Sequence, residues 1–182
     1  MELYKGLYYH LYNRTINCEP AFREARNYSY FLYKYNTYIA PHVKTYAYCL
    51  MPTHFHVLLQ VNTENENQLK KNVGIMLSSY AKAFNHSFNR HGSLFQQHTK
   101  AILIDDDSYL ITLIHYIHQN PLRAGLVEQF KDWPYSSYLA FCGIQPKTQL
   151  YTELIDQYYH DLGDFINASS EMIREVPRRF WI

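Results

Sequence analysis

The sequence predicts an α+β fold of the ferredoxin-like (RRM-like) kind, in which an antiparallel sheet of four to five strands packs against helices. The first observation is the order strand–helix–strand–strand–helix–strand that apolar periodicity gives for residues 7–104. The second is the short break at residues 51–53, which makes the runs on either side neighbouring antiparallel strands. The third is an apolar content of 47% with six Gly and seven Pro residues, which is typical of a folded globule.

The individual elements are placed by side-chain periodicity and by breaks at proline or polar residues. Apolar side chains recur at a period near 3.6 between Pro20 and Pro41 and again after the polar loop 62–67. An acidic run at 105–107 signals the start of a further helix, and Pro121 its end. We therefore expect strands over 7–16, 43–50, 54–61 and 94–104, and helices over 21–39, 68–89 and 107–120. A helical C-terminal extension is expected to include the amphipathic stretch 150–169.

Charge and cysteine usage limit the class of protein. Lys and Arg number 17 against 16 Asp and Glu, so the net charge is +1 and the expected non-specific affinity for nucleic acid is low. The three cysteines are widely separated, which suits a reducing compartment. The N-terminus lacks a signal-peptide layout, and no apolar run approaches the ~20 residues of a membrane span. We expect a cytoplasmic protein without a membrane partner.

Two histidines lie in the strand expected over residues 54–61. Side chains alternate along a strand, so His54 and His56 share one face and project in parallel, about 7 Å apart at Cα. Both imidazoles can reach one divalent cation at metal–nitrogen bonds of ~2.1 Å. An isolated His-x-His pair is more often structural, so a metal site needs support from elsewhere in the chain.

That support comes from the helix expected over residues 107–120. Its apolar side chains form a stripe that should face the sheet, and Tyr116 and Asn120 lie together along one border of the stripe. His115 and His118 fall on the other side of the helix. The pair Tyr116/Asn120 therefore presents a phenol and an amide oxygen that can meet the strand histidines. The alternative is that Tyr116 packs like many of the other 18 tyrosines and that Asn120 caps the helix.

Five ordered stretches resemble the single-tyrosine HUH transposases, in the form carried by the REP-associated tyrosine transposases. The run YCLMPTHFHVLLQ resembles their His-hydrophobe-His strand, and YIHQNPLRAGLV resembles their catalytic helix. The other three stretches are YYHLYNRTINCEPAF, AFNHSFNRHGSLFQQHTKAILI and DWPYSSYLAFCG. The resemblance implies a catalytic domain over residues 1–143, with 144–182 as its helical extension. The sequence departs from the family pattern at His98 and Thr99, where an Arg-Phe pair is common.

The resemblance also implies a chemistry. Tyr116 would be the nucleophile, and His54, His56 and Asn120 would bind a divalent metal. Two imidazoles and an amide oxygen leave positions open for phosphate and water, which suits Mg²⁺ or Mn²⁺. The reaction would nick and join single-stranded DNA through a 5′-phosphotyrosine, near a hairpin or palindromic end. Candidate phosphate contacts are Arg14, Lys82, Lys100 and Arg123, for each of which a solvated surface position is the alternative.

Two other functions fit the same residues. In a metal-dependent phosphodiesterase, His54 and His56 would activate water and Tyr116 would take no part. In a non-catalytic nucleic-acid-binding module, tyrosines of the sheet would stack on bases, as in RNA-recognition folds. A covalent protein–DNA adduct distinguishes the transposase from both. Whether the tyrosine helix serves its own subunit or a partner in a homodimer is left open by the sequence.

Overall fold

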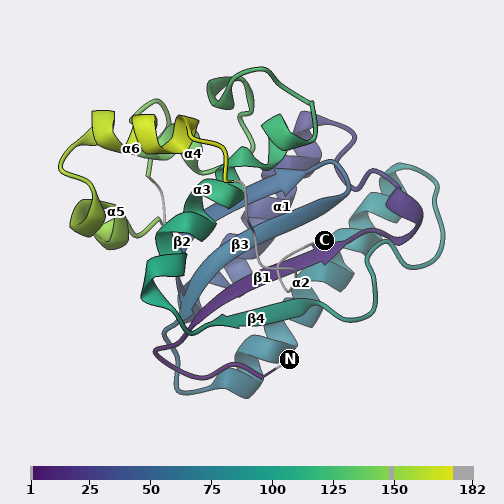
Figure 1. Ribbon diagram of the computed structural model, residues 1–182. Helices are drawn as coiled ribbons and strands as arrows, with labels where there is room; N and C mark the ends of the chain where they lie inside the picture. Colours follow the sequence, from purple (N-terminus) through teal and green to yellow (C-terminus); the bar gives the residue numbers. More distant parts are fainter. Residues whose placement is uncertain (1, 148–149, 174–182) are drawn as a thin grey trace.

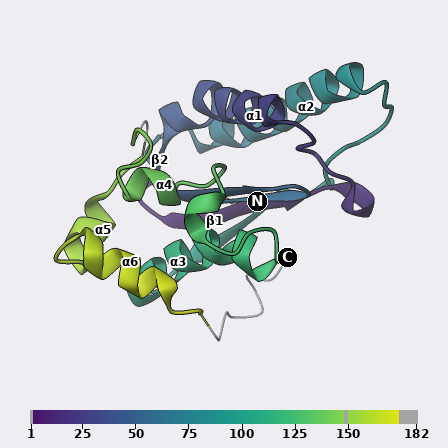
Figure 2. The same cartoon turned by 90° about the horizontal axis from the view of Figure 1, so that it is seen from above.

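The computed structural model describes residues 2–147 and 150–173 and confirms the α+β architecture. Four antiparallel strands form one sheet in the order β2-β3-β1-β4, which is the ferredoxin-like order. The strands are β1 (Tyr8–Arg14), β2 (Val43–Met51), β3 (His54–Val61) and β4 (Lys100–Ile104). Figures 1 and 2 show the sheet as the middle of three layers, with helices on both faces.

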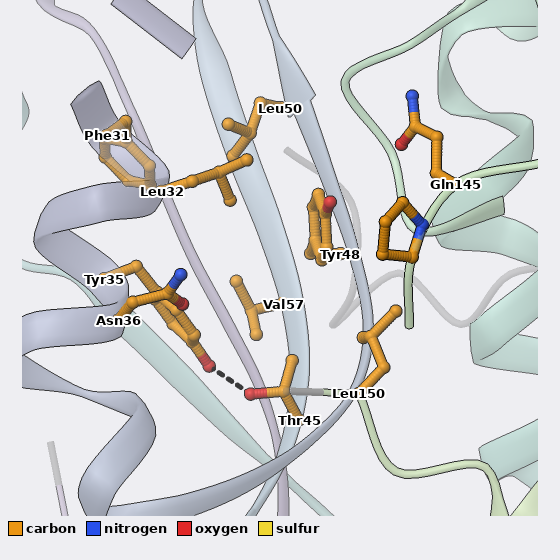
Figure 3. Close-up of a pocket in the computed structure, with 11 residues that line it drawn as sticks. Phe31, Leu32, Tyr35, Asn36, Thr45, Tyr48, Leu50, Val57, Gln145 and Leu150 are labelled. Atoms are coloured by element: carbon orange, nitrogen blue, oxygen red, sulfur yellow. Dashed lines mark hydrogen bonds between the residues drawn. The ribbon is translucent and has the colours of Figure 1, made fainter. Parts of the chain in front are cut away.

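Helices α1 (Ala25–Tyr38) and α2 (Glu66–Ser87) cover one face of the sheet. Phe55, Val57, Leu59 and Val61 alternate onto this face and pack in a core with apolar side chains of both helices. Between α1 and β2 this layer encloses a cavity of about 190 Å³ (Figure 3), where the Tyr35 hydroxyl lies 2.7 Å from Thr45 Oγ1. The predicted assignment of β3 residues to two faces is thus confirmed.

Helix α3 (Asp107–Arg123) covers part of the opposite face, beside β2 (Figure 1). Leu110, Leu113, Ile114 and Ile117 are almost fully buried there against Leu58 and apolar side chains of β2. The short helices α5 (Glu153–Tyr158) and α6 (Leu162–Ser170) lie outside α3 on the same side of the sheet (Figure 2). Helix α4 (Tyr138–Phe141) follows a bridge between Ser136 and Cys49 of β2 and adds apolar side chains to the same core. The apolar stripe of α3 therefore faces the sheet, as predicted.

Several element boundaries differ from the prediction. The fourth strand begins at Lys100 and not at residue 94, because the segment before it turns to bury Leu94 and Phe95 in the core. The side-chain amide of Asn13 holds this segment by donating to the Gln96 carbonyl and to Thr99 Oγ1.

Two further observations concern helix ends. Helix α1 begins four residues later than expected, at Ala25, where Glu24 and Asn27 form a capping box. The amphipathic stretch 150–169 is not one helix, because Asp161 interrupts it as the N-cap of α6 and accepts a hydrogen bond from Asp164 N. The tail EVPRRFWI lies outside the described residues. Among the described helices, none combines the length and apolarity needed to cross a bilayer.

Candidate active site

The candidate site is built on the face of the sheet that α3 partly covers. Strand register places Tyr12 of β1 opposite His56 of β3, and Arg14 opposite His54. Opposed residues of antiparallel strands point to the same face, so these four side chains form two adjacent rows. The tight connection between β2 and β3, where Met51 pairs with His54, positions the first histidine at the end of the strand.

His54 lies at the partly exposed end of this arrangement. Its Nδ1 is 3.0 Å from the Thr53 hydroxyl, which leaves Nε2 as the nitrogen available to bind a ligand. The rings of His54 and His56 are perpendicular, with centroids 5.1 Å apart. Burial, followed by the positive charge of Arg14, lowers the pKa of His54 to about 4. The ring is therefore neutral at pH 7, as metal binding requires.

His56 lies deeper and is completely buried. Its Nδ1 is 2.9 Å from Nε2 of His10, a residue of β1. Its own Nε2 forms no well-directed hydrogen bond with the described residues. Burial, together with the neighbouring His10 and His54, holds the pKa of His56 well below its usual range, and a polar contact with the Asn120 side chain acts in the opposite direction. A buried, neutral nitrogen that makes no well-directed hydrogen bond with the described residues is what an imidazole ligand offers to a cation.

Helix α3 brings Tyr116 to this pair. The rings of Tyr116 and His56 meet edge to face with centroids 6.1 Å apart, and only 9% of Tyr116 is exposed. The guanidinium carbon of Arg123 lies 5.5 Å from the centre of the Tyr116 ring. Burial raises the pKa of the phenol, while the positive charge of Arg123 lowers it. Tyr116 is thus protonated at neutral pH and lies beside the histidines of its own chain.

Asn120 lies one turn further along α3. The sequence predicted that the helix ends at Pro121, but α3 continues past this proline. The Asn120 side-chain nitrogen donates to the carbonyl oxygens of Tyr116, at 2.9 Å, and Ile117, at 3.4 Å. Ile117 is the residue whose carbonyl an N–H at position 121 would have met, so the Asn120 amide replaces the donor that proline lacks. The helix ends at Arg123, and Gly125 follows with a positive φ of 65°. With its nitrogen held by the helix, Asn120 retains its side-chain oxygen for the histidine pair.

The residues fit the metal that the sequence resemblance implies. Two neutral imidazoles, each with Nδ1 held by a neighbour, and one amide oxygen form a nitrogen–oxygen donor set. This set lacks the thiolates that are typical of structural zinc sites. His54 and His56 come from the sheet, whereas Asn120 comes from α3, so the set links the two layers.

Comparison with known proteins shows what the chain is similar to. No family model matches the chain. A protein of Haemophilus influenzae that is provisionally described as a REP-associated tyrosine transposase is 34% identical over 103 residues. The chain resembles the REP-associated tyrosine transposases. The match covers 52% of this chain and 58% of that relative, so it spans little more than half the length of either protein.

A solved structure extends the likeness to the whole fold. The structure of a REP-associated tyrosine transposase bound to a REP hairpin superposes with a TM-score of 0.56, covering 96% of this chain and 97% of the other at 17% sequence identity. At that identity the likeness establishes the fold. The predicted fold class and the predicted resemblance to REP-associated transposases are therefore both confirmed.

Three of the four predicted phosphate contacts lie around the histidine pair. Arg14 lowers the pKa of His54 by its charge, and Arg123 lies over Tyr116. Lys100 is exposed and pairs with Tyr12, in the same row across the sheet as His56. Lys82 is different, because it lies on α2, which packs on the other face, and the structure does not bring it to the pair.

The sequence analysis missed His10. Alternation along β1 was visible in the sequence, but the register that sets His10 beside His56 was not, because register depends on pairing between strands. His115 and His118 lie away from the pair, as predicted: His115 Nδ1 is 3.0 Å from Ser169 Oγ of α6, and His118 Nε2 is 2.7 Å from Ser137 Oγ. Thr99, at the departure from the family pattern, accepts a hydrogen bond from Asn13.

Proposed function

We propose that this protein nicks and joins single-stranded DNA by tyrosine transesterification, as a transposase or strand transferase of the HUH type. The observation that carries the proposal is the contact of Tyr116 and Asn120, on one helix, with the buried His56 of the sheet. A phosphodiesterase that used water alone would not need a phenol at this position. The curated relative and the solved structure named above support a DNA-processing function.

Tyr116 would attack the scissile phosphate. The phenol loses its proton as a bond forms between the phenolic oxygen and phosphorus. The bond from phosphorus to the 3′ oxygen breaks, and the leaving 3′ oxygen takes up a proton and becomes a 3′-hydroxyl, so the protons balance. A 5′-phosphotyrosine keeps the energy of the phosphodiester, so a second 3′-hydroxyl can reverse the step and join a new strand. The rigid helix holds the phenol in place, and such positioning supplies several kcal/mol of the barrier reduction.

The charged groups around Tyr116 have separate roles in this proposal. Arg123, 5.5 Å from the ring, favours the phenolate as it forms. A divalent ion, Mg²⁺ or Mn²⁺, would be held by His54, His56 and Asn120 and would supply Lewis-acid polarisation of the phosphate. Arg14 and Lys100, on the same face, would bind the flanking phosphates, and a hairpin or palindromic end would present the single strand. Because α3 covers the histidines of its own chain, Tyr116 would act in cis.

The test is covalent capture of labelled DNA. Single-stranded DNA carrying a label on the 3′ side of the scissile phosphate should become attached to the wild-type protein in Mn²⁺, giving a labelled band in a denaturing gel. Tyr116→Phe should abolish the adduct and leave folding nearly unchanged, since one hydroxyl is lost. Tyr109→Phe, on the same helix, is the matched control and should retain it.

Three outcomes would contradict the proposal. An undiminished adduct in Tyr116→Phe would assign the nucleophile to another residue. Metal-dependent cleavage without any adduct, lost in His56→Ala but kept in Tyr116→Phe, would identify a water-using phosphodiesterase. Binding without cleavage under all metal conditions would identify a nucleic-acid-binding module.

A further inference from the structure

His10 lies directly beside His56 and has no part in the reaction proposed above. The two rings are stacked, with centroids 5.1 Å apart and planes inclined by 11°, and His10 Nε2 is 2.9 Å from His56 Nδ1. Both residues are completely buried. Water therefore cannot substitute for either partner, and this hydrogen bond fixes how the His56 ring is turned.

The bond also links the proton positions of the two rings. A neutral imidazole carries one proton, and the bridge between the rings holds only one. If His56 donates from Nδ1, then its Nε2 has a free electron pair. If His10 donates instead, the proton of His56 must lie on Nε2, and that nitrogen cannot bind a cation.

The surroundings of His56 favour donation from its Nδ1. An N–H at Nε2 would lack a well-directed acceptor among the described residues. A buried donor with a poorly directed hydrogen bond is unfavourable. A bare Nε2, by contrast, is satisfied as soon as a cation binds, and it lies next to the Asn120 amide, the third member of the donor set.

We infer that His10 is a positioning residue for the metal site: it accepts the Nδ1 proton of His56 and so holds both the orientation and the tautomer that leave Nε2 bare. This inference rests on the metal site of the proposed function. Partners that hydrogen-bond to metal-ligating histidines typically change metal affinity by about 10–100-fold when they are removed. His10 should have an effect of that size although it touches neither metal nor DNA.

Metal affinity tests the inference without requiring activity. Titration of Mn²⁺ followed by electron paramagnetic resonance should show at least about tenfold weaker binding in His10→Phe than in the wild type. His10→Gln should restore most of the affinity, because its side-chain oxygen can accept the same proton. Tyr35→Phe is the matched control, since it also removes one buried hydrogen bond but on the other face of the sheet (Figure 3).

The tautomer itself can be read in the unaltered protein. Imidazole nitrogen shifts of ¹⁵N-labelled wild type in Mg²⁺ should show His56 protonated on Nδ1 and bare on Nε2. This measurement can overturn the inference even if His10→Phe fails to fold. A His56 ring protonated on Nε2 in Mg²⁺-loaded protein would overturn it.

The outcomes separate this inference from the proposed function. Suppose that the wild-type protein binds Mn²⁺, that His56→Ala loses this binding, and that folded His10→Phe binds Mn²⁺ as tightly as the wild type. This result would overturn the role of His10 alone. Wild-type protein whose Mn²⁺ binding is absent or unaffected by His56→Ala would overturn the metal site, and with it the ligand that His10 is inferred to position.

Discussion

At the scale of the single residue, Asn120 has a structural role in α3 and, under the proposed function, a chemical role at the metal site. Its amide nitrogen completes the helix at the point where Pro121 lacks an N–H, by donating to the carbonyls of Tyr116 and Ile117. Its side-chain amide contacts His56. The two roles use different ends of one amide group, so substitutions can separate them.

Asn120→Asp and Asn120→Leu provide that separation. Both variants lose the amide donor, so both should be destabilised by a similar amount, about 1 kcal/mol. Asn120→Asp keeps an oxygen and should retain Mn²⁺ binding, whereas Asn120→Leu should lose most of it. Urea unfolding in EDTA and Mn²⁺ titration measure the two effects. Equal Mn²⁺ affinity in the two variants would remove Asn120 from the ligand set.

At the scale of the element, the C-terminal extension forms hydrogen bonds with helix α3. His115 contacts the Ser169 hydroxyl with one ring nitrogen and the Tyr159 hydroxyl with the other. Gln119 donates to the carbonyls of Ser169 and Glu171. These contacts come from the side of α3 that faces away from the histidine pair. They give the extension a role in fixing where Tyr116 lies.

Removing these contacts should loosen α3. The double variant Tyr159→Phe, Ser169→Ala leaves both ring nitrogens of His115 without their partners, at a cost of about 1–3 kcal/mol for each unpaired group. Amide hydrogen exchange in α3 should accelerate, while exchange in β1 and β3 changes less. Ser170→Ala, whose hydroxyl bonds to the Asn167 carbonyl on the exposed side, is the control. Uniform acceleration across the whole chain would show general destabilisation instead.

Some features of these elements could be predicted from the sequence, and others could not. The faces of β3 and the edge of α3 that carries Tyr116 and Asn120 follow from local periodicity, and the structure has them as predicted. The start of β4 and the position of His10 depend on side chains distant in sequence, whereas the passage of α3 through Pro121 depends on the side-chain amide of the adjacent Asn120. Asn13 fixes the segment before β4, and strand register sets His10. Such contacts are not visible in a local pattern.

At the scale of the whole molecule, buried histidines are spread through one side of the fold. Burial lowers the pKa of His118 to about 3, with a smaller contribution from His115, and burial also lowers the pKa of His115 to about 4. The ordinary pKa of 6.5 applies to the unfolded chain. Below pH 6.5 the unfolded chain therefore binds protons that the folded protein does not. The free energy of unfolding consequently decreases as the pH is lowered.

This predicts a specific pH profile. The free energy of unfolding should be nearly constant above about pH 7.5 and should fall between pH 6.5 and about 4, by up to ~1.4 kcal/mol per pH unit for each such histidine. Urea unfolding in EDTA at a series of pH values measures the slope. His118→Gln should make the slope shallower in this window. A profile that is flat down to pH 4.5 would mean that these rings are protonated in the folded state.

Tyr116 and the histidine beside it belong to one chain, and this has a consequence for mixed populations. In an assembly in which each site took its tyrosine from a neighbouring subunit, an inactive subunit would also inactivate the site of an active neighbour. Two subunits with different inactivating substitutions could then form one active site together. Here, under the proposed function, each copy holds its own complete set. Activity in a cell that carried intact and defective alleles would then follow the number of intact copies alone, and a defective allele would be recessive.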